Sequence, residues 1–154
     1  MLFLNVQCLR NKVNILDASL IDHNFSGVGM CEHWLKEEEA ATIKLDNYIT
    51  VDYFARVRHV HGGVIQFLNP NIEYKTLSHI KKLSVELQCE ITGSFLPKFD
   101  LFFIVIYRTP SGDINLFLEL MTKLLNALDY KTKHIVVGGD FNAHLDIETC
   151  YKYW

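Results

Sequence analysis

The stretch HIVVGGDFNAH, residues 134–144, joins an apolar run to a group of polar side chains. Its apolar residues, two of them β-branched valines, predict a short buried strand that Gly138 and Gly139 end. Asp140, Asn142 and His144 then alternate, so an extended backbone would place them on one side. Polar groups at the end of a buried strand indicate a ligand site in an α/β sheet. The alternative is an Asx-type turn, which Asp and Asn favour through local hydrogen bonds.

Length and charge restrict the protein class. The chain has 154 residues, a net charge of −3, and 49% hydrophobic residues, which predicts one globular domain over residues 1–154. It lacks the strongly basic composition typical of a nucleic-acid-binding surface. A nucleic-acid partner is nevertheless compatible with this charge, because metal-binding carboxylates add acidic residues at an active site.

Compartment and membrane association are predicted from the cysteines and the apolar runs. The four cysteines have no CxxC spacing, which favours reduced thiols over a disulfide framework or a zinc cluster. The N-terminal residues do not form a signal peptide. The longest apolar run, 101–107, is far shorter than the roughly 20 residues of a membrane helix. The sequence therefore predicts an intracellular protein without a membrane segment.

Apolar periodicity predicts alternating strands and helices. We expect strands over 2–6, 25–31, 48–54, 62–68, 72–76, 83–91 and 101–107, and helices over 11–24 and from about Ile114, with Asp113 as N-cap. In the 83–91 strand the apolar residues would face one way and Ser84, Glu86, Gln88 and Glu90 the other, before a turn over 93–99. This order predicts a mixed α/β fold with helices packed on sheets.

Five polar residues lie at or near the ends of predicted strands: Asn5, Glu32, Tyr107, Asp140 and Asn142. Asn5 could instead form a hydrogen bond within the core. Glu32 would be costly to bury unpaired, so it either meets a cation or metal or ends its strand at the surface. Together the five predict a site. Residues 56–61 form a basic loop, in which His59 and His61 have a spacing that could bind a metal.

Five blocks of this sequence resemble the endonuclease/exonuclease/phosphatase superfamily. They are LNVQCLRNK (4–12), CEHWL (31–35), GGV (62–64), YRTPSGD (107–113) and GDFNAH (139–144). Their order and spacing are most similar to the apurinic-type endonuclease domain of non-long-terminal-repeat retrotransposons. The resemblance covers essentially the whole chain and implies a two-sheet α/β sandwich flanked by helices, of the DNase I-like type.

The resemblance also implies metal-dependent phosphodiester cleavage of DNA, with Mg²⁺ or Mn²⁺. Glu32 would be the main metal ligand, with Asn5 close by. Asp140 and Asn142 would hold the scissile phosphate and the attacking water. Tyr107 would contact the phosphate, and His144 matches a position beside the site. Hard cations prefer such oxygen ligands. The protein would be nuclear if it acts on genomic DNA; its oligomeric state is left open.

The sequence also departs from the family pattern. Two later blocks of the family, one with an aspartate and one with Ser-Asp-His, have no match in residues 145–154, so the resemblance implies a fold without its C-terminal strands. Gln7 stands where repair-type relatives have an acid, and His33 where threonine is usual. Two alternatives to an endonuclease follow: a non-catalytic retroelement remnant that acts by binding, and a phosphoesterase acting on a small molecule or lipid headgroup.

Overall fold

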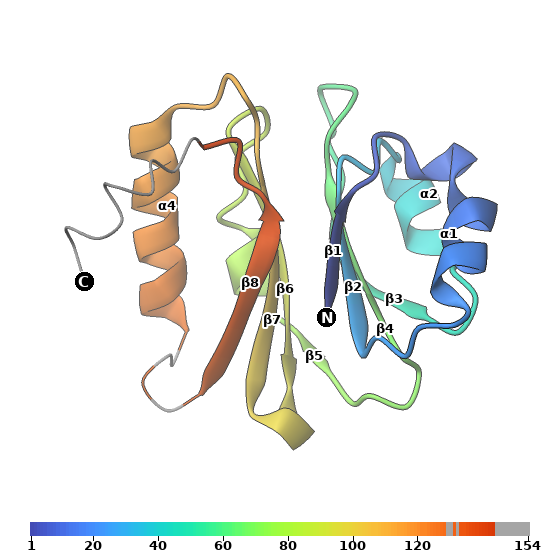
Figure 1. Cartoon of the computed structure of the whole chain (residues 1–154). Coiled ribbons are helices and arrows are strands. Elements are labelled where there is room, and N and C mark those ends of the chain that lie inside the picture. Colours follow the sequence, from blue (N-terminus) through green and yellow to red (C-terminus); the bar gives the residue numbers. More distant parts are fainter. Residues whose placement is uncertain (129–130, 132, 144–154) are drawn as a thin grey trace.

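Two sheets face each other and carry helices on their outer sides (Figure 1). The computed structural model describes residues 1–128, 131 and 133–143. In this part of the chain each sheet has four strands. The helices α1 and α2 cover the first sheet, and α4 covers the second (Figure 1). The two-sheet sandwich that the sequence predicts is therefore confirmed.

The first sheet has the strand order β1-β2-β4-β3. Its strands are β1 (Leu2–Asn5), β2 (Gly27–Cys31), β3 (Ile49–Phe54) and β4 (Val64–Leu68). The pair β1 and β2 is parallel, and the other pairs are antiparallel. A 3-10 turn (Leu9–Asn11) and helix α1 (Val13–Leu20) connect β1 to β2, while α2 (Glu37–Thr42) precedes β3.

The second sheet has the order β5-β6-β7-β8. Its strands are β5 (Lys75–Thr76), β6 (Cys89–Leu96), β7 (Leu101–Arg108) and β8 (His134–Asp140), and only β7 and β8 are parallel. The short elements α3 (Ser78–Lys81) and a 3-10 turn (Pro97–Phe99) flank β6. Helix α4 (Ile114–Ala127) connects β7 to β8, and the Asp113 carboxylate accepts from the N–H of Asn115 at 2.7 Å, as an N-cap does.

Three apolar clusters hold the layers together. One lies between the first sheet and α1, and another between the second sheet and α4. The third joins residues of both sheets, among them Leu68, Phe103 and Val105. Strand β7 is buried from Phe102 onward because the first sheet covers one of its faces and α4 the other. This explains why residues 101–107 form a continuous apolar run.

The predicted strand over 83–91 is wrong. Residues 85–89 form a tight turn instead: the N–H of Cys89 donates to Val85 O at 3.0 Å, and Leu87 has φ +63°. Val85 and Leu87 are 40% and 37% exposed, whereas Glu90 is fully buried. Strand β6 then runs through Gly93, where a turn was expected, and Gly93 pairs with Ile104 of β7. The Ile104 side chain occupies the space that a side chain at residue 93 would need, so the glycine serves close packing and not a turn. The alternation of polar and apolar residues continued across a turn and misplaced both faces.

Some predicted boundaries also shift. Strand β8 does not end at its two glycines but continues to Asp140. Gly139 has φ +140°, and a side chain there would overlap the carbonyl oxygen of Ile106 on β7. The strand expected over 72–76 is reduced to two residues. None of the helices in the described part of the chain is both long and apolar enough to cross a membrane.

Candidate active site

The polar strand ends of the two sheets meet at one edge of the sandwich. In the first sheet, Asn5 at the end of β1 is the register partner of Cys31, the residue before Glu32. In the second sheet, Tyr107 and Asp140 are register partners on β7 and β8. Both parallel pairs therefore present polar residues at their carboxyl ends, where ligands bind in α/β sheets.

Asn5 connects the two halves of the site. Its side-chain Nδ2 donates to Oε1 of Glu32 at 2.8 Å and to Oδ2 of Asp140 at 2.7 Å. Two carboxylates from different sheets thus converge on one neutral amide. Among the described residues, neither carboxylate forms an ion pair. The site therefore has uncompensated negative charge, which favours a bound cation.

The backbone holds Glu32 in place. Its N–H donates to Gly63 O at 2.8 Å, and its carbonyl accepts from the N–H of Cys8 at 3.0 Å. Its φ of +57° is uncommon for a residue with a side chain. The indole N–H of Trp34 donates to Oε2 of Glu32 at 3.3 Å. Glu32 thus lies in a fixed, partly exposed position instead of simply ending its strand.

Tyr107 lies beside Glu32 on the inner side of the site and is only 5% exposed. Burial raises the pKa of its hydroxyl above the usual value, and the charge of the Glu32 carboxylate and a hydrogen bond to it raise that pKa further. The hydroxyl therefore stays protonated and can donate. In this position Tyr107 can orient Glu32, and the phosphate contact predicted from the sequence stays a prediction.

Asp140 and Asn142 combine the two alternatives that the sequence left open. The N–H of Asn142 donates to Oδ1 of Asp140 at 3.1 Å, which is an Asx-type turn. The same turn leaves Oδ2 of Asp140 to bind Asn5. Both residues line an open pocket of about 630 Å³ together with Asn5. His144, the remaining polar residue of this stretch, lies outside the described residues.

Arg108 fixes the position of Asn142. Its Nη1 donates to the backbone carbonyl of Asn142 at 2.7 Å, and its Nη2 donates to that of Gly112. In return, Nδ2 of Asn142 donates to the carbonyl of Arg108 at 2.7 Å. The sequence contains Arg108 within the YRTPSGD block, but the sequence alone does not give it a role. Its signal is a charged residue at the end of an apolar run.

The donor set fits a hard divalent cation. Glu32 and Asp140 supply carboxylate oxygens, and Asn5 has an amide oxygen; Mg²⁺ is bound by a few such ligands and otherwise keeps its waters. The described residues contain no group of three His, Cys, Asp or Glu side chains that could hold a metal. His59 instead pairs with Glu86 at 2.7 Å, and His61 packs on Trp34. A His59–His61 metal site is therefore not supported.

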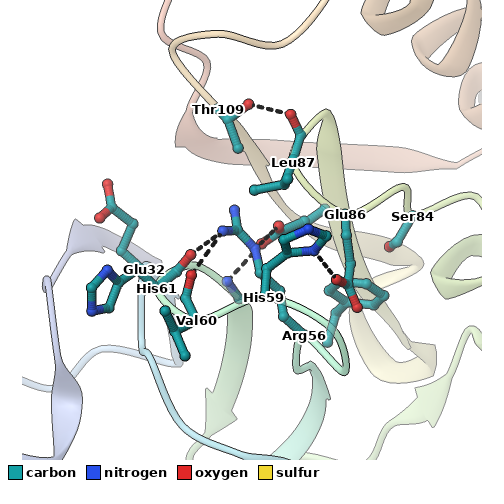
Figure 2. A network of polar contacts seen from close by, with 12 residues as sticks. Glu32, Arg56, His59, Val60, His61, Ser84, Glu86, Leu87 and Thr109 are labelled. Carbon is teal, nitrogen blue, oxygen red and sulfur yellow. Dashed lines mark hydrogen bonds and ion pairs between the residues drawn. The ribbon is translucent and has the colours of Figure 1, made fainter.

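A buried ion pair lies behind Glu32, and the sequence did not predict it. The side chains of Arg56 and Glu90 are 6% and 0% exposed and are directly hydrogen-bonded. Glu90 also accepts from the N–H of Gly63 at 2.6 Å. Figure 2 shows the Arg56 guanidinium beside the carbonyls of Val60 and His61. Sequence reasoning missed the pair because it placed Glu90 on the polar face of a predicted strand, together with Ser84, Glu86 and Gln88.

His33 holds the loop that follows β2 and carries Glu32, through hydrogen bonds of its buried ring. Its Nε2 lies 3.0 Å from Phe54 O, and its Nδ1 accepts from the N–H of Leu35 at 2.9 Å. This pattern fits a neutral imidazole. Burial lowers its pKa from 6.5 to about 4. Burial likewise raises the pKa of the neighbouring Cys31 thiol to about 12, so this thiol stays neutral.

Comparison with known proteins identifies the fold. No protein-family model and no curated protein sequence match the chain. An AP endonuclease from Archaeoglobus fulgidus has 15% identity and a TM-score of 0.64, over 92% of this chain and 56% of its own. The 3' phosphatase NExo from Neisseria, bound to a product DNA hairpin, has 18% identity and a TM-score of 0.62, over 94% and 58%.

A third solved structure with the same fold is a mannosyl-6-phosphatase from Bacteroides thetaiotaomicron. It has 13% identity and a TM-score of 0.57, and the match covers 91% of this chain and 64% of that chain. The present chain thus spans somewhat more than half the length of these proteins. Their shared architecture shows that it has a DNase I-like endonuclease/exonuclease/phosphatase fold.

Proposed function

We propose that this chain belongs to a metal-dependent phosphodiesterase that cleaves DNA, of the apurinic-type endonuclease branch found in non-long-terminal-repeat retrotransposons. The observation that carries the proposal is the double hydrogen bond of Asn5, which brings Glu32 and Asp140 together without a cationic partner among the described residues. The sequence blocks around these residues support the branch. The fold shared with solved proteins that bind or act on DNA supports the substrate class.

Each residue of the site has a role in this proposal. Glu32 and Asn5 hold Mg²⁺ or Mn²⁺, which neutralises phosphate charge and assists the leaving oxygen. Asn142, whose Nδ2 is bound to Arg108 O, can accept a hydrogen bond from the attacking water through its amide oxygen. Asp140 holds Asn5 and shapes the phosphate pocket. Tyr107 keeps its proton and donates to Glu32 or to a phosphate oxygen.

We expect slow turnover from these 154 residues. Among the described residues beside Glu32, His33 cannot act as a general base, since it is buried and engaged at both ring nitrogens. A missing general base typically costs about 10² to 10⁴ in rate. Metal binding is therefore a more sensitive readout than cleavage, and both should be measured.

The test combines thermal unfolding with plasmid nicking, each over a Mg²⁺ and a Mn²⁺ titration. Wild type is compared with Glu32→Ala and with Glu73→Ala, which removes an exposed carboxylate away from the site. Saturating metal should raise the Tm of wild type and Glu73→Ala by roughly 5 °C and leave Glu32→Ala unchanged. Nicking should follow the same pattern. An equal metal response in all three proteins would contradict the proposal.

A second candidate function is hydrolysis of a small phosphate ester. The observation that favours it is the shared fold of the Bacteroides sugar phosphatase. Parallel assays on supercoiled DNA, mannose 6-phosphate and a phosphoinositide separate the two. Metal-dependent phosphate release from a small ester without nicking would select this second function. DNA binding that does not depend on Glu32 or on metal would instead indicate a binding protein without catalysis.

A further inference from the structure

A second pocket, of about 570 Å³, lies beside Glu32. Its lining includes Trp34, Arg56, Arg58 and His61, and it shares no lining residue with the pocket of Asn5 and Asp140. The two pockets are linked through Glu32, which accepts a hydrogen bond from the Trp34 indole. The metal-binding carboxylate therefore has a second pocket next to it that the proposed chemistry does not use.

Two aromatic rings that contact each other at a tilt form part of this second pocket. The centroids of the Trp34 and His61 rings are 4.2 Å apart, with an angle of 37° between the planes. Both residues have left-handed backbone angles, φ +57° and +63°, and the N–H of Trp34 donates to Gly62 O at 2.9 Å. The loops are thus locked in the conformation that presents the rings. Paired aromatic rings at a pocket surface are a typical platform for a nucleobase.

Arg56 forms part of the wall of the same pocket. Its side chain is only 6% exposed and its other nitrogens are bound to Glu90 and to the carbonyls of Val60 and His61 (Figure 2). Its Nη2 is buried and has no hydrogen-bond partner among the described residues. Because this nitrogen is closed off from solvent, Arg56 shapes the wall of the pocket, and a phosphate must find its donor elsewhere in the lining.

Arg58 adds positive charge at the rim. It is exposed and forms no ion pair within the described part of the chain. The adjacent His59 contacts the Glu86 carboxylate, with Nδ1 and Oε2 2.7 Å apart, so the loop that carries Arg58 is held to the turn that precedes β6 (Figure 2). The two aromatic rings and the exposed Arg58 side chain at the rim together match a nucleotide.

We propose that this second pocket binds an unpaired nucleotide next to the scissile phosphate. Its base stacks on the Trp34–His61 pair, and its phosphate accepts hydrogen bonds from Arg58. The inference rests on the proposed function and narrows its substrate to DNA with single-stranded character, because a base must leave the duplex to reach such a platform. Single-stranded DNA should therefore bind more tightly than duplex of the same length.

The test measures Kd by fluorescence anisotropy in EDTA, so that nothing is cleaved. The probes are a labelled single-stranded oligodeoxynucleotide, its duplex and an abasic strand of equal length. Trp34→Ala and His61→Ala should each weaken binding of the base-containing single strand about tenfold and leave the abasic strand unchanged. Trp34→Phe keeps a ring and should stay near wild type. His23→Ala, which removes an exposed histidine packed on Phe25 elsewhere, is the matched control.

The phosphate contact is tested with Arg58→Ala, which removes the exposed guanidinium at the rim and leaves the Arg56–Glu90 pair intact. It should weaken the base-containing and abasic strands alike, in a protein whose circular dichroism equals that of wild type. Wild-type affinity in Trp34→Ala and His61→Ala, with Glu32→Ala still insensitive to metal, would overturn the pocket and leave the proposed function standing. Failure of wild type to bind any strand, together with no metal-dependent nicking, would overturn both.

Discussion

The two parallel strand pairs of this protein have the same plan but are secured differently. In β1–α1–β2 the polar residues are Asn5 and Glu32, and in β7–α4–β8 they are Tyr107 and Asp140. In each pair a helix connects the strands, and the carboxyl ends face the site. The two pairs therefore differ mainly in the interactions that hold each carboxylate, Glu32 or Asp140, in position.

The first pair is secured by backbone. Strand β2 lies between β1 and β4, and the loop after it donates from Glu32 to Gly63 O and from Trp34 to Gly62 O. In the described residues β8 pairs with β7 alone, and the loop after it depends on the side chain of Arg108. Backbone contacts survive most substitutions, whereas a side-chain contact is lost with one. Asp140 should therefore be the more easily displaced carboxylate.

The largest contrast is expected between glycines of β8 and β2. Gly139→Ala forces a side chain into the backbone of Ile106 at φ +140°, and should lower the free energy of unfolding by roughly 4 kcal/mol. Gly29→Ala meets the side chains of Val105 and Phe3, which can shift, and should cost about 2 kcal/mol. Urea unfolding of both variants measures the difference. A greater loss in Gly29→Ala would mean that the backbone around Gly139 adjusts to a new side chain more easily than the side chains around Gly29 do.

Low pH should destabilise the part of the protein around β1 and β2 through protonation of His33. Its pKa is about 4 in the folded protein and 6.5 when exposed, because burial disfavours the charged ring. The unfolded chain therefore takes up this proton first, and the stability contributed by the neutral ring is lost as pH falls from about 6.5 to about 4. The loss amounts to about 3 kcal/mol. Chemical denaturation across this pH range measures it.

The control for this prediction is His33→Gln, which does not titrate. The difference in unfolding free energy between wild type and His33→Gln should shrink steadily below pH 6.5. The comparison cancels Glu90, whose pKa burial raises and whose effect on stability has the opposite sign. His23→Ala should follow wild type. A constant difference between wild type and His33→Gln would show that folding leaves the pKa of His33 unchanged.

Removing the arginine clamp should release the second pair. Arg108→Met keeps much of the packing but leaves the carbonyls of Asn142 and Gly112 without their donor, which should cost about 2 kcal/mol. Arg58→Met, an exposed arginine on the first-sheet side, should stay within about 0.5 kcal/mol of wild type. Thermal and urea unfolding compare the two. Equal stability of both variants would mean that backbone pairing alone holds the loop after β8.

The sequence predicted the strands and helices better than the side-chain contacts that hold the site in position. Apolar runs and the Asp113 cap correctly placed β7 and α4, since burial on both faces and local capping leave direct patterns in the chain. The ion pair of Arg56 with Glu90 and the hydrogen bond of Arg108 to Asn142 each join residues that are 34 positions apart in the chain. No periodicity encodes such a contact. For Glu90 the misleading signal was a polar–apolar alternation that ran through the turn at 85–89.

The site formed by Asn5, Glu32 and Asp140 could be predicted from the sequence only in part. Strand ends and residue types suggested a shared site, because parallel pairs bring their carboxyl ends to one edge. The bridging role of Asn5 could not be predicted, since it depends on how closely the two sheets pack. The hydrogen bonds of 2.8 and 2.7 Å across the sandwich are a tertiary property.

The smallest effect is expected where the two pairs touch, at Tyr107 of the second and Glu32 of the first. Tyr107→Phe keeps the buried ring but removes the protonated hydroxyl beside the Glu32 carboxylate. Because such outer contacts orient a metal ligand, the midpoint of the Mg²⁺-induced Tm shift should move about tenfold higher, or about 1.4 kcal/mol. Tyr53→Phe, at another hydroxyl that donates to a glutamate, is the matched control. An unchanged midpoint in Tyr107→Phe would mean that Glu32 is oriented by its own pair alone, through the backbone bonds to Gly63 and Cys8.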